Sequence, residues 1–193
     1  MTDHSSILAA AVGEIGGDAR PGQQAMADAV AQAFEDGTHL LVQAGTGTGK
    51  SLGYLAPALA RCADSEEVVV VATATLALQA QLATKDIPTA LDAVESVTGK
   101  RPKAAILKGR TNYACLHRSR SGSDGQQEAL IGETTQLGAE VLALREWVEE
   151  EVERGTVADR DDAPAHTARA WSQVSIPTRE CLGVANCRFG AEC

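Results

Sequence analysis

An eight-residue glycine-rich segment carries the clearest chemistry in the sequence. It lies between a predicted strand at residues 39–43 and a predicted helix at residues 50–62, and it consists of Ala44, Gly45, Thr46, Gly47, Thr48, Gly49, Lys50 and Ser51. Glycines let successive backbone N–H groups point at an anion beside a helix N-terminus. Lys50 adds a positive charge, and the hydroxyl of Ser51 suits Mg²⁺. The order strand, loop, helix therefore predicts a phosphate-binding loop rather than a glycine-rich turn with a surface lysine.

A glutamine upstream of this loop is a second candidate contact for a nucleotide. Gln23 stands at the start of a helix that we predict over residues 22–35, directly after Arg20, Pro21 and Gly22. A primary amide offers both a donor and an acceptor, so Gln23 could read the edge of an adenine. A solvent-exposed helix start explains the same residues. Only the combination with the phosphate loop favours the adenine contact.

Four of the five cysteines form a pattern. Cys115 is followed, far along the chain, by Cys181, Cys187 and Cys193, with five residues between successive members of the last three. Structural zinc sites favour cysteine pairs separated by about two to four residues, and no such pair occurs here. Thiolates from a loop and a distant segment suit a four-iron cluster at least as well. Unrelated thiols are the alternative, and Cys62, outside the pattern, is interpreted as a packed or free thiol.

The elements that must position these residues alternate along the first part of the chain. Strands are predicted at 39–43, 67–72 and 104–108, and they alternate with helices at 50–62 and 75–83. The second strand holds four consecutive valines, which is typical of a strand buried on both faces of a parallel sheet. The βαβαβ order predicts an α/β fold. Within the first of these helices, Pro57 predicts a kink or a short helix.

The composition and the predicted elements of the chain change after about residue 112. A Ser/Gly linker at 119–125 precedes a long polar helical stretch at 126–154, which is apolar along one side. A charged loop at 155–166 and an irregular segment with three cysteines follow. We therefore expect one domain over residues 1–112, an incomplete nucleotide-binding domain, and a second over residues 113–193.

The net charge of −9 hides a partition into blocks. No acidic residue lies between Glu95 and Asp124, and this basic block contains Lys100, Arg101, Lys103, Lys108, Arg110, Arg118 and Arg120. Residues 124–162 then hold twelve acidic residues against three arginines. A net negative charge argues against a nucleic-acid partner, whereas the basic block argues for one or is a solvated loop.

Composition excludes several classes of protein. A chain of 193 residues that is 44% apolar can bury a core. The uncharged stretch at 68–78 is shorter than the roughly 20 residues of a membrane span, and no basic region precedes the apolar residues 7–12 as in a secretory signal. We expect a cytoplasmic monomer without a membrane partner, in which cysteines serve as metal ligands or free thiols.

Five segments together resemble one family. They are AGTGTGKS at 44–51, TATLALQ at 73–79, KDIP at 85–88, KGRTNYAC at 108–115 and ECLGVANCRFGAEC at 180–193. Their order is similar to that in DinG-type helicases of the XPD-like iron–sulfur group. The alanine-rich composition and residues 171–175 resemble the actinobacterial branch. The resemblance runs from about Arg20 to the last residue, and the cysteine framework is its most specific part.

The resemblance implies a superfamily 2 motor that couples ATP hydrolysis to 5′→3′ unwinding of DNA in repair and replication. It implies a P-loop, RecA-like parallel sheet into which a mainly α-helical [4Fe–4S] domain is inserted, with ATP and Mg²⁺ as further cofactors and single-stranded or fork-like DNA as partner. By analogy, Gln23 senses adenine, Lys50 and Ser51 act in catalysis at the phosphates and Mg²⁺, and the ligands of the cluster are Cys115, Cys181, Cys187 and Cys193. The residues placed near DNA are Thr73, Thr75, Gln79, Lys108, Arg110, Asn112 and Tyr113.

Two parts of such a motor are not found in the 193 residues. An Asp-Glu pair after a later strand and an arginine from a second RecA-like domain are needed for hydrolysis. The pair Asp161-Asp162 follows no apolar strand, so we expect the N-terminal part of a helicase that binds nucleotide but does not unwind DNA by itself. The alternatives are a nucleotide-binding module whose cysteines hold zinc or nothing, and a redox-responsive iron–sulfur protein with a vestigial phosphate loop.

Overall fold

The computed structural model describes residues 2–18, 20–65, 67–121 and 135–193. The chain divides into two compact units, Met1–Ile106 and Leu107–Cys193, each with its own core. Residues 107–112, which we assign to the first domain on sequence, lie with the second unit. Their contacts explain this: the Lys108 ammonium and the Thr111 carbonyl bond to residues after position 158.

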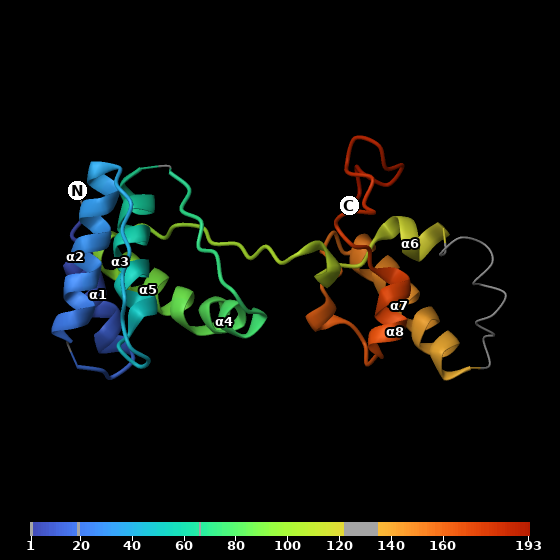
Figure 1. The fold of residues 1–193 in the computed structure, drawn as a ribbon, viewed down its shortest axis with the longest axis horizontal. Coiled ribbons are helices and arrows are strands. Elements are labelled where there is room, and N and C mark those ends of the chain that lie inside the picture. The colour runs from blue at the N-terminus through green and yellow to red at the C-terminus, as the bar shows by residue number, and fades with distance from the viewer. Residues whose placement is uncertain (1, 19, 66, 122–134) are drawn as a thin grey trace. The chain divides into compact units, whose positions relative to one another are not determined.

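The first unit is built from helices (Figure 1). They are α1 (His4–Glu14), α2 (Pro21–Asp36), α3 (Lys50–Asp64), α4 (Leu76–Gln81), the π-helical turn η1 (Leu82–Asp86) and α5 (Ile87–Thr98). The Asp3 side chain caps α1 by accepting from the N–H groups of Ser5 and Ser6. Helix α2 ends at Gly37, whose φ of 62° suits glycine.

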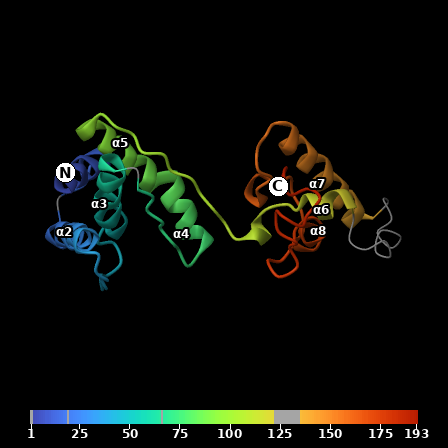
Figure 2. The ribbon, with the colours of Figure 1, turned by 90° about the horizontal axis from the view of Figure 1, so that it is seen from above.

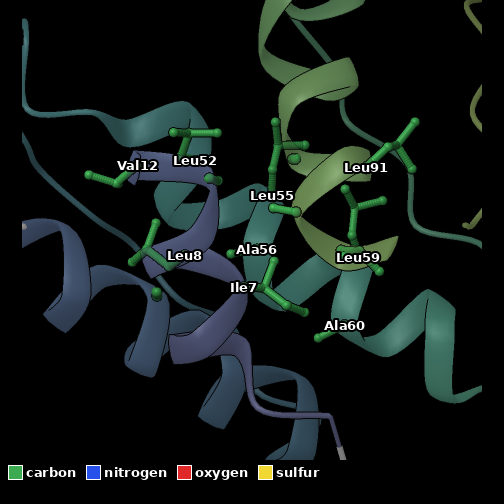
Figure 3. Close-up of a cluster of buried hydrophobic side chains, with 14 of the residues drawn as sticks. Ile7, Leu8, Val12, Leu52, Leu55, Ala56, Leu59, Ala60 and Leu91 are labelled. Atoms are coloured by element: carbon green, nitrogen blue, oxygen red, sulfur yellow. The ribbon is translucent and has the colours of Figure 1, made fainter. Parts of the chain in front are cut away.

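The core of this unit lies where α1 and α5 pack against α3, which also contacts α2. Figure 3 shows Ile7, Leu8 and Val12 of α1 beside Leu52, Leu55, Ala56 and Leu59 of α3, with Leu91 of α5 nearby. Ile7 is fully buried. Alanines such as Ala56 and Ala93 are also buried, so these helix backbones can approach closely.

The three predicted strands do not form a sheet in the described residues, which contain no named strand (Figure 1). Segments 39–43, 67–72 and 104–108 run without regular secondary structure. Their apolar side chains are exposed: Leu41 is 98% exposed, Val68 86% and Val70 83%. A strand needs hydrogen-bonding partners and a covered face, and these segments find neither. The expectation that the valines are buried on both faces is therefore wrong for this structure.

The predicted helices are present, with some differences in length. Helix α2 covers the expected range, and α3 continues through Pro57 to Asp64, so the shorter helix does not form. The helix expected at residues 75–83 continues as η1 and α5 to Thr98. Helix α1 is not among the predicted elements, although an aspartate before an apolar run at helical spacing is a usual helix start.

The second unit contains less helical structure than the first (Figure 2). Its elements are η2 (Arg110–Asn112), α6 (Leu116–Ser121), α7 (Gln136–Glu153), η3 (Arg160–Asp162) and α8 (Ala168–Val174). Leu144 of α7 packs on Trp171 and Val174 of α8. Two isolated antiparallel bridges, Tyr113 with Asp159 and Ala114 with Ser175, tie the segment before α6 to the rest of the unit.

Helix α7 confirms the C-terminal part of the predicted polar helix, with Val141, Leu144 and Val148 buried along one side. Residues 122–134, which include most of the predicted linker and the start of that helix, lie outside the described residues. After α8 the chain is irregular, as predicted. None of the described helices is long and apolar enough to cross a membrane.

Candidate functional sites

The phosphate loop leads directly into the N-terminus of α3. Gly49 stands before the helix in the left-handed conformation, with φ of 78°, and its carbonyl accepts from the N–H of Gly53. No side chain caps this helix start. The first N–H groups of α3 are therefore available to an anion, and the helix dipole adds positive potential there.

The Lys50 side chain folds across the loop. Its ammonium donates to the carbonyl of Ala44 at 3.0 Å and to that of Gly45 at 2.7 Å. The hydroxyl of Thr48 also donates to the Gly45 carbonyl, at 3.0 Å. An ammonium has three donors, so these bonds hold the Lys50 charge at the loop and leave one N–H for a ligand oxygen.

Two residues from the start of α2 brace the same loop. Gln23 is 5% exposed, and its amide nitrogen donates to the Gly49 carbonyl at 2.7 Å. The Arg20 guanidinium donates to the Gly47 carbonyl. A Cβ at position 49 would lie 2.3 Å from the Gln23 nitrogen and would displace that amide, and the positive φ also favours glycine there. The structure brings the two predicted nucleotide motifs together, and the adenine contact of Gln23 stays a prediction.

A cleft of about 500 Å³ opens beside the loop. It is lined by the loop residues 46–52 together with residues of α4, η1 and α5, among them Leu78, Gln81, Lys85, Asp86 and Thr89. Sequence reasoning did not select Lys85, Asp86 or Thr89 as site residues. Lys85 and Asp86 belong to the KDIP segment, which contributes to the family resemblance. Only the packing of η1 near α3 brings them to the loop.

Tyr54 is a further neighbour of the loop that sequence reasoning missed. Its hydroxyl lies near that of Ser51, one turn earlier on α3. Partial burial raises the pKa of Tyr54, the Ser51 hydroxyl lowers it, and the charge of Asp86 raises it. Tyr54 therefore stays protonated at neutral pH and can orient the Ser51 hydroxyl, the candidate Mg²⁺ ligand.

The predicted DNA residues of the first unit lie at the start of α4. Thr75 caps this helix by accepting from the N–H of Leu78 at 3.2 Å. The Thr73 hydroxyl donates to the Thr75 carbonyl at 3.3 Å, and the N–H of Gln79 donates to the same carbonyl at 3.1 Å. These bonds explain both threonines locally, so contact with DNA stays a prediction for all three residues.

The predicted DNA residues of the second unit gather around η2. Tyr113 places its hydroxyl 2.8 Å from the N–H of Lys108, and the Asn112 amide donates to the Gly109 carbonyl at 3.0 Å. Arg110 is close enough to Cys193 for its charge to oppose in part the increase of the pKa of that thiol, which burial causes first. The indole N–H of Trp171 fixes the turn by donating to the Thr111 carbonyl at 2.7 Å. Sequence reasoning gave Trp171 no role.

Most of the basic block is engaged by carboxylates. The Lys108 ammonium contacts Asp159 and Asp161 at 2.7 Å, and desolvation lowers its pKa less than these partners raise it. The other ion pairs of the block join Arg101 to Asp92 and Glu95, Arg118 to Glu180, and Arg120 to Glu149 and Glu192. Within the described residues, only Lys103 and Arg110 of the block donate no hydrogen bond. The acidic and basic blocks of the sequence therefore partly neutralise each other.

The four patterned cysteines lie in the second unit. Cys115 is buried and precedes α6, Cys181 and Cys187 are half-buried, and Cys193 is exposed as a residue although its thiol is partly covered. The pKa of Cys193 is raised by this desolvation first, and then by the charges of Cys115, Cys181 and Cys187. The thiols of Cys115, Cys181 and Cys187 thus all lie near the thiol of Cys193. In the described part of the chain, no three His, Cys, Asp or Glu side chains are arranged to hold a metal ion.

Comparison with known proteins adds the family. Residues 20–117, half of the chain, match the family model described as DEAD/DEAH box helicase. The chain belongs to the DEAD/DEAH box helicase family. This membership implies the P-loop NTPase fold, whereas the described residues contain helices and no named strand.

Curated relatives of this DEAD/DEAH box protein are DinG-type helicases. The chain is 50% identical over 197 residues to the ATP-dependent helicase DinG of Mycobacterium tuberculosis, covering 97% of this chain and 29% of the relative. It is 39% identical over 176 residues to the ATP-dependent DNA helicase YoaA of Escherichia coli (strain K12), covering 90% and 25%. The ATP-dependent DNA helicase DinG of the same strain is 38% identical over 96 residues, covering 49% and 13%.

These matches confirm the resemblance to DinG-type helicases that the motifs indicate. The chain spans less than a third of the length of these relatives. The best-defined candidate site of this DEAD/DEAH box protein is the phosphate loop, together with Arg20 and Gln23, which bond to it.

Proposed function

We propose that the chain is the ATP-binding part of an ATP-dependent DNA helicase. The observation that carries this proposal is the loop at the start of α3, where uncapped N–H groups and the Lys50 ammonium face a cleft of about 500 Å³. An open cleft of this size can admit a nucleotide. The phosphates bind the N–H groups and Lys50, and the Ser51 hydroxyl, oriented by Tyr54, takes Mg²⁺.

The test is nucleotide binding by the 193-residue chain, measured by calorimetry with and without Mg²⁺. Lys50→Ala is expected to weaken ATP binding by about tenfold or more, because a charge-assisted contact to phosphate is lost. The matched control is Lys103→Ala, which removes an equal charge from a lysine that makes no hydrogen bond. Equal affinity of Lys50→Ala and the unchanged chain would contradict the proposal.

We also propose that Cys115, Cys181, Cys187 and Cys193 hold a [4Fe–4S] cluster. The donor set fits this group, since the thiols of Cys115, Cys181 and Cys187 all lie near that of Cys193 in the second unit. A tetrahedral zinc ion, with Zn–S of about 2.3 Å, needs its four sulfurs much closer together than separate irons of one cluster do. When bound, such a cluster would cross-link distant segments and stabilise a unit with small cores.

The metal content of anaerobically purified chain tests this second part. We expect visible absorbance with about four irons and four sulfides per chain. A colourless chain that carries zinc would refute the cluster and favour the zinc-binding nucleotide module. Cys62→Ser is the matched control, because this thiol lies in the first unit and should leave the iron content unchanged.

For the DNA-directed activity we propose action on single-stranded or fork-like DNA as a monomer, with 5′→3′ polarity, in DNA repair. The relatives named as DNA helicases support the DNA partner. Within the 193 residues, the pair Asp161-Asp162 belongs to η3 and does not line the nucleotide cleft. The chain by itself is therefore proposed to bind ATP without unwinding DNA, and strand displacement by this chain in a fluorescence assay would contradict that.

A further inference from the structure

Two arginines on α6 contact the segment that contains the last three cysteines. Helix α6 begins directly after Cys115. The Arg118 guanidinium donates to Glu180 at 2.6 Å, and that of Arg120 donates to Glu192 at 2.7 Å. Each glutamate stands immediately before a cysteine, Cys181 and Cys193 respectively. Both ion pairs therefore join the helix next to one patterned thiol to the neighbour of another.

Arg120 has further contacts that fix its position. Its Nε and Nη2 atoms donate to the two oxygens of Glu149 on α7, at 2.8 and 2.9 Å. Its guanidinium lies 5.1 Å from the centre of the Phe189 ring, and that of Arg188 lies 4.6 Å from the same ring. Phe189 in turn packs against a small core that contains Val148. A two-pronged bond to a carboxylate and a stacked ring restrain an arginine far more than a single exposed ion pair does.

The segment between these cysteines has two further side-chain contacts with α6: the Arg188 guanidinium donates to the Ser121 hydroxyl, and the His117 ring lies 6.2 Å from the Phe189 ring. Residues 176–193 contain no helix or strand, so ordering them costs conformational entropy that local hydrogen bonds alone offset poorly. The turn after Cys187 does approach the preceding one closely. A Cβ at Gly190 would lie 2.1 Å from the Val184 carbonyl oxygen. This contact fits the two turns together, but it does not attach them to Cys115.

We propose that Arg118 and Arg120 are positioning residues that hold Cys181 and Cys193 beside Cys115 before any cluster binds. The inference rests on the proposed [4Fe–4S] site and names the residues that prepare it. Neither arginine touches the cluster ligands through a bond of its own. They act through Glu180, Glu192 and Phe189, on which the positions of the thiols depend.

Limited proteolysis of the iron-free chain tests the attachment itself. Trypsin cuts after Arg179 and Arg188, and we expect both cuts to be about three to ten times faster in Arg118→Gln and Arg120→Gln. Arg154→Gln is the matched control, because Arg154 pairs only with Glu150 and Glu151 near the end of α7. Cleavage rates that are equal in all four proteins, read by mass spectrometry, would overturn the inference.

Charge exchange with reconstitution tests the consequence for the thiols. Arg118→Glu and Glu180→Arg are each expected to lower the iron and sulfide bound per chain at least twofold, and the double variant to restore it, because the ion pair is rebuilt in reverse. Circular dichroism of each variant verifies that the helices form. A double variant that binds no more iron than the single ones would count against the inference. If the unchanged chain takes up no iron but the cleavage contrast persists, the cluster proposal fails and the positioning by arginine stands.

Discussion

Gly49 shows how a single residue joins the two nucleotide motifs. Its backbone is left-handed, which favours glycine, and the space where a Cβ would lie is occupied by the amide of Gln23. Gly47 has a similar φ of 74°, yet a Cβ there would meet nothing within 4 Å. Substituting each glycine in turn therefore distinguishes the effect of backbone strain from that of the contact with Gln23.

We predict that Gly49→Ala destabilises the chain by about 2–4 kcal/mol and Gly47→Ala by about 1–2 kcal/mol. In both variants the alanine is strained by the left-handed conformation, and only Gly49→Ala also displaces Gln23. Urea denaturation followed by circular dichroism gives the two free energies of unfolding. Equal losses would mean that the Gln23 contact adds nothing.

Asp3 provides a prediction of pH dependence. Its pKa is lowered, first by the hydroxyl of Ser6 and then by the N–H of Ser5, both of which bond to the ionised carboxylate. Because the pKa is lower in the folded chain, the stabilisation is fully present above the unfolded value of about 3.9 and is lost as the pH falls through the folded value.

We expect Asp3→Ala to cost about 1 kcal/mol at pH 7, through loss of the helix cap. Asp3→Asn keeps the cap and should show a weaker loss of stability than the unchanged chain as the pH falls below about 4, in denaturation curves at each pH. Asp18→Asn is the control, since Asp18 caps none of the described helices. An identical acid profile for Asp3→Asn and the unchanged chain would refute the assignment.

At the scale of elements, α8 fixes the turn η2 through Trp171. The indole N–H bonds to the Thr111 carbonyl, while the ring lies 5.5 Å from the Arg160 guanidinium and 5.2 Å from the His166 ring. The turn carries Arg110, a candidate DNA residue. A helix far along the chain therefore sets the position of a predicted contact.

Trp171→Phe should cost about 1–3 kcal/mol, because the ring stays packed but the Thr111 carbonyl loses its donor. In the same variant, DNA binding should weaken as the turn loosens, without a change in ATP affinity, since the nucleotide cleft belongs to the first unit. Denaturation and a DNA-binding titration measure the two effects. Unchanged DNA affinity would show that η2 takes no part in that contact.

At the scale of the whole molecule, many basic side chains form ion pairs with acidic ones. The sequence contains a basic block next to an acidic stretch, and the structure joins Lys108 to Asp159 and Asp161, and Arg120 to Glu149. In the proposed contact with DNA, phosphate groups would compete with these carboxylates for the same cations. Neutralising Lys108, Arg110 and Arg118 should therefore weaken DNA binding and its dependence on salt.

The converse change gives a sharper test. The double variant Asp159→Asn, Asp161→Asn releases Lys108, so we expect tighter binding of single-stranded DNA. The logarithm of the binding constant should also fall more steeply with the logarithm of the salt concentration, by about one unit of slope. Glu150→Gln with Glu151→Gln removes the same charge beside Arg154 and serves as the control. If both double variants bind alike, Lys108 makes no contact with DNA.

The sequence by itself determined the glycine-rich turn before α3, helices α2 and α7, and the family. These depend on residues close together in the chain, namely the glycines before Lys50 and Ser51 and the apolar positions at helical spacing. The cysteine pattern and the adenine contact of Gln23 stay predictions.

Only the tertiary structure decided which charges are paired, where Gln23 and Trp171 lie, and whether strands form. Arg118 and Glu180 are 62 positions apart, and nothing in either neighbourhood predicts their contact. The valines at 68–71 favour a strand, but a strand exists only when another segment supplies hydrogen bonds and a covered face. Local patterns specify helices, whose bonds are local, whereas sheets and ion pairs depend on residues that the chain brings together from a distance.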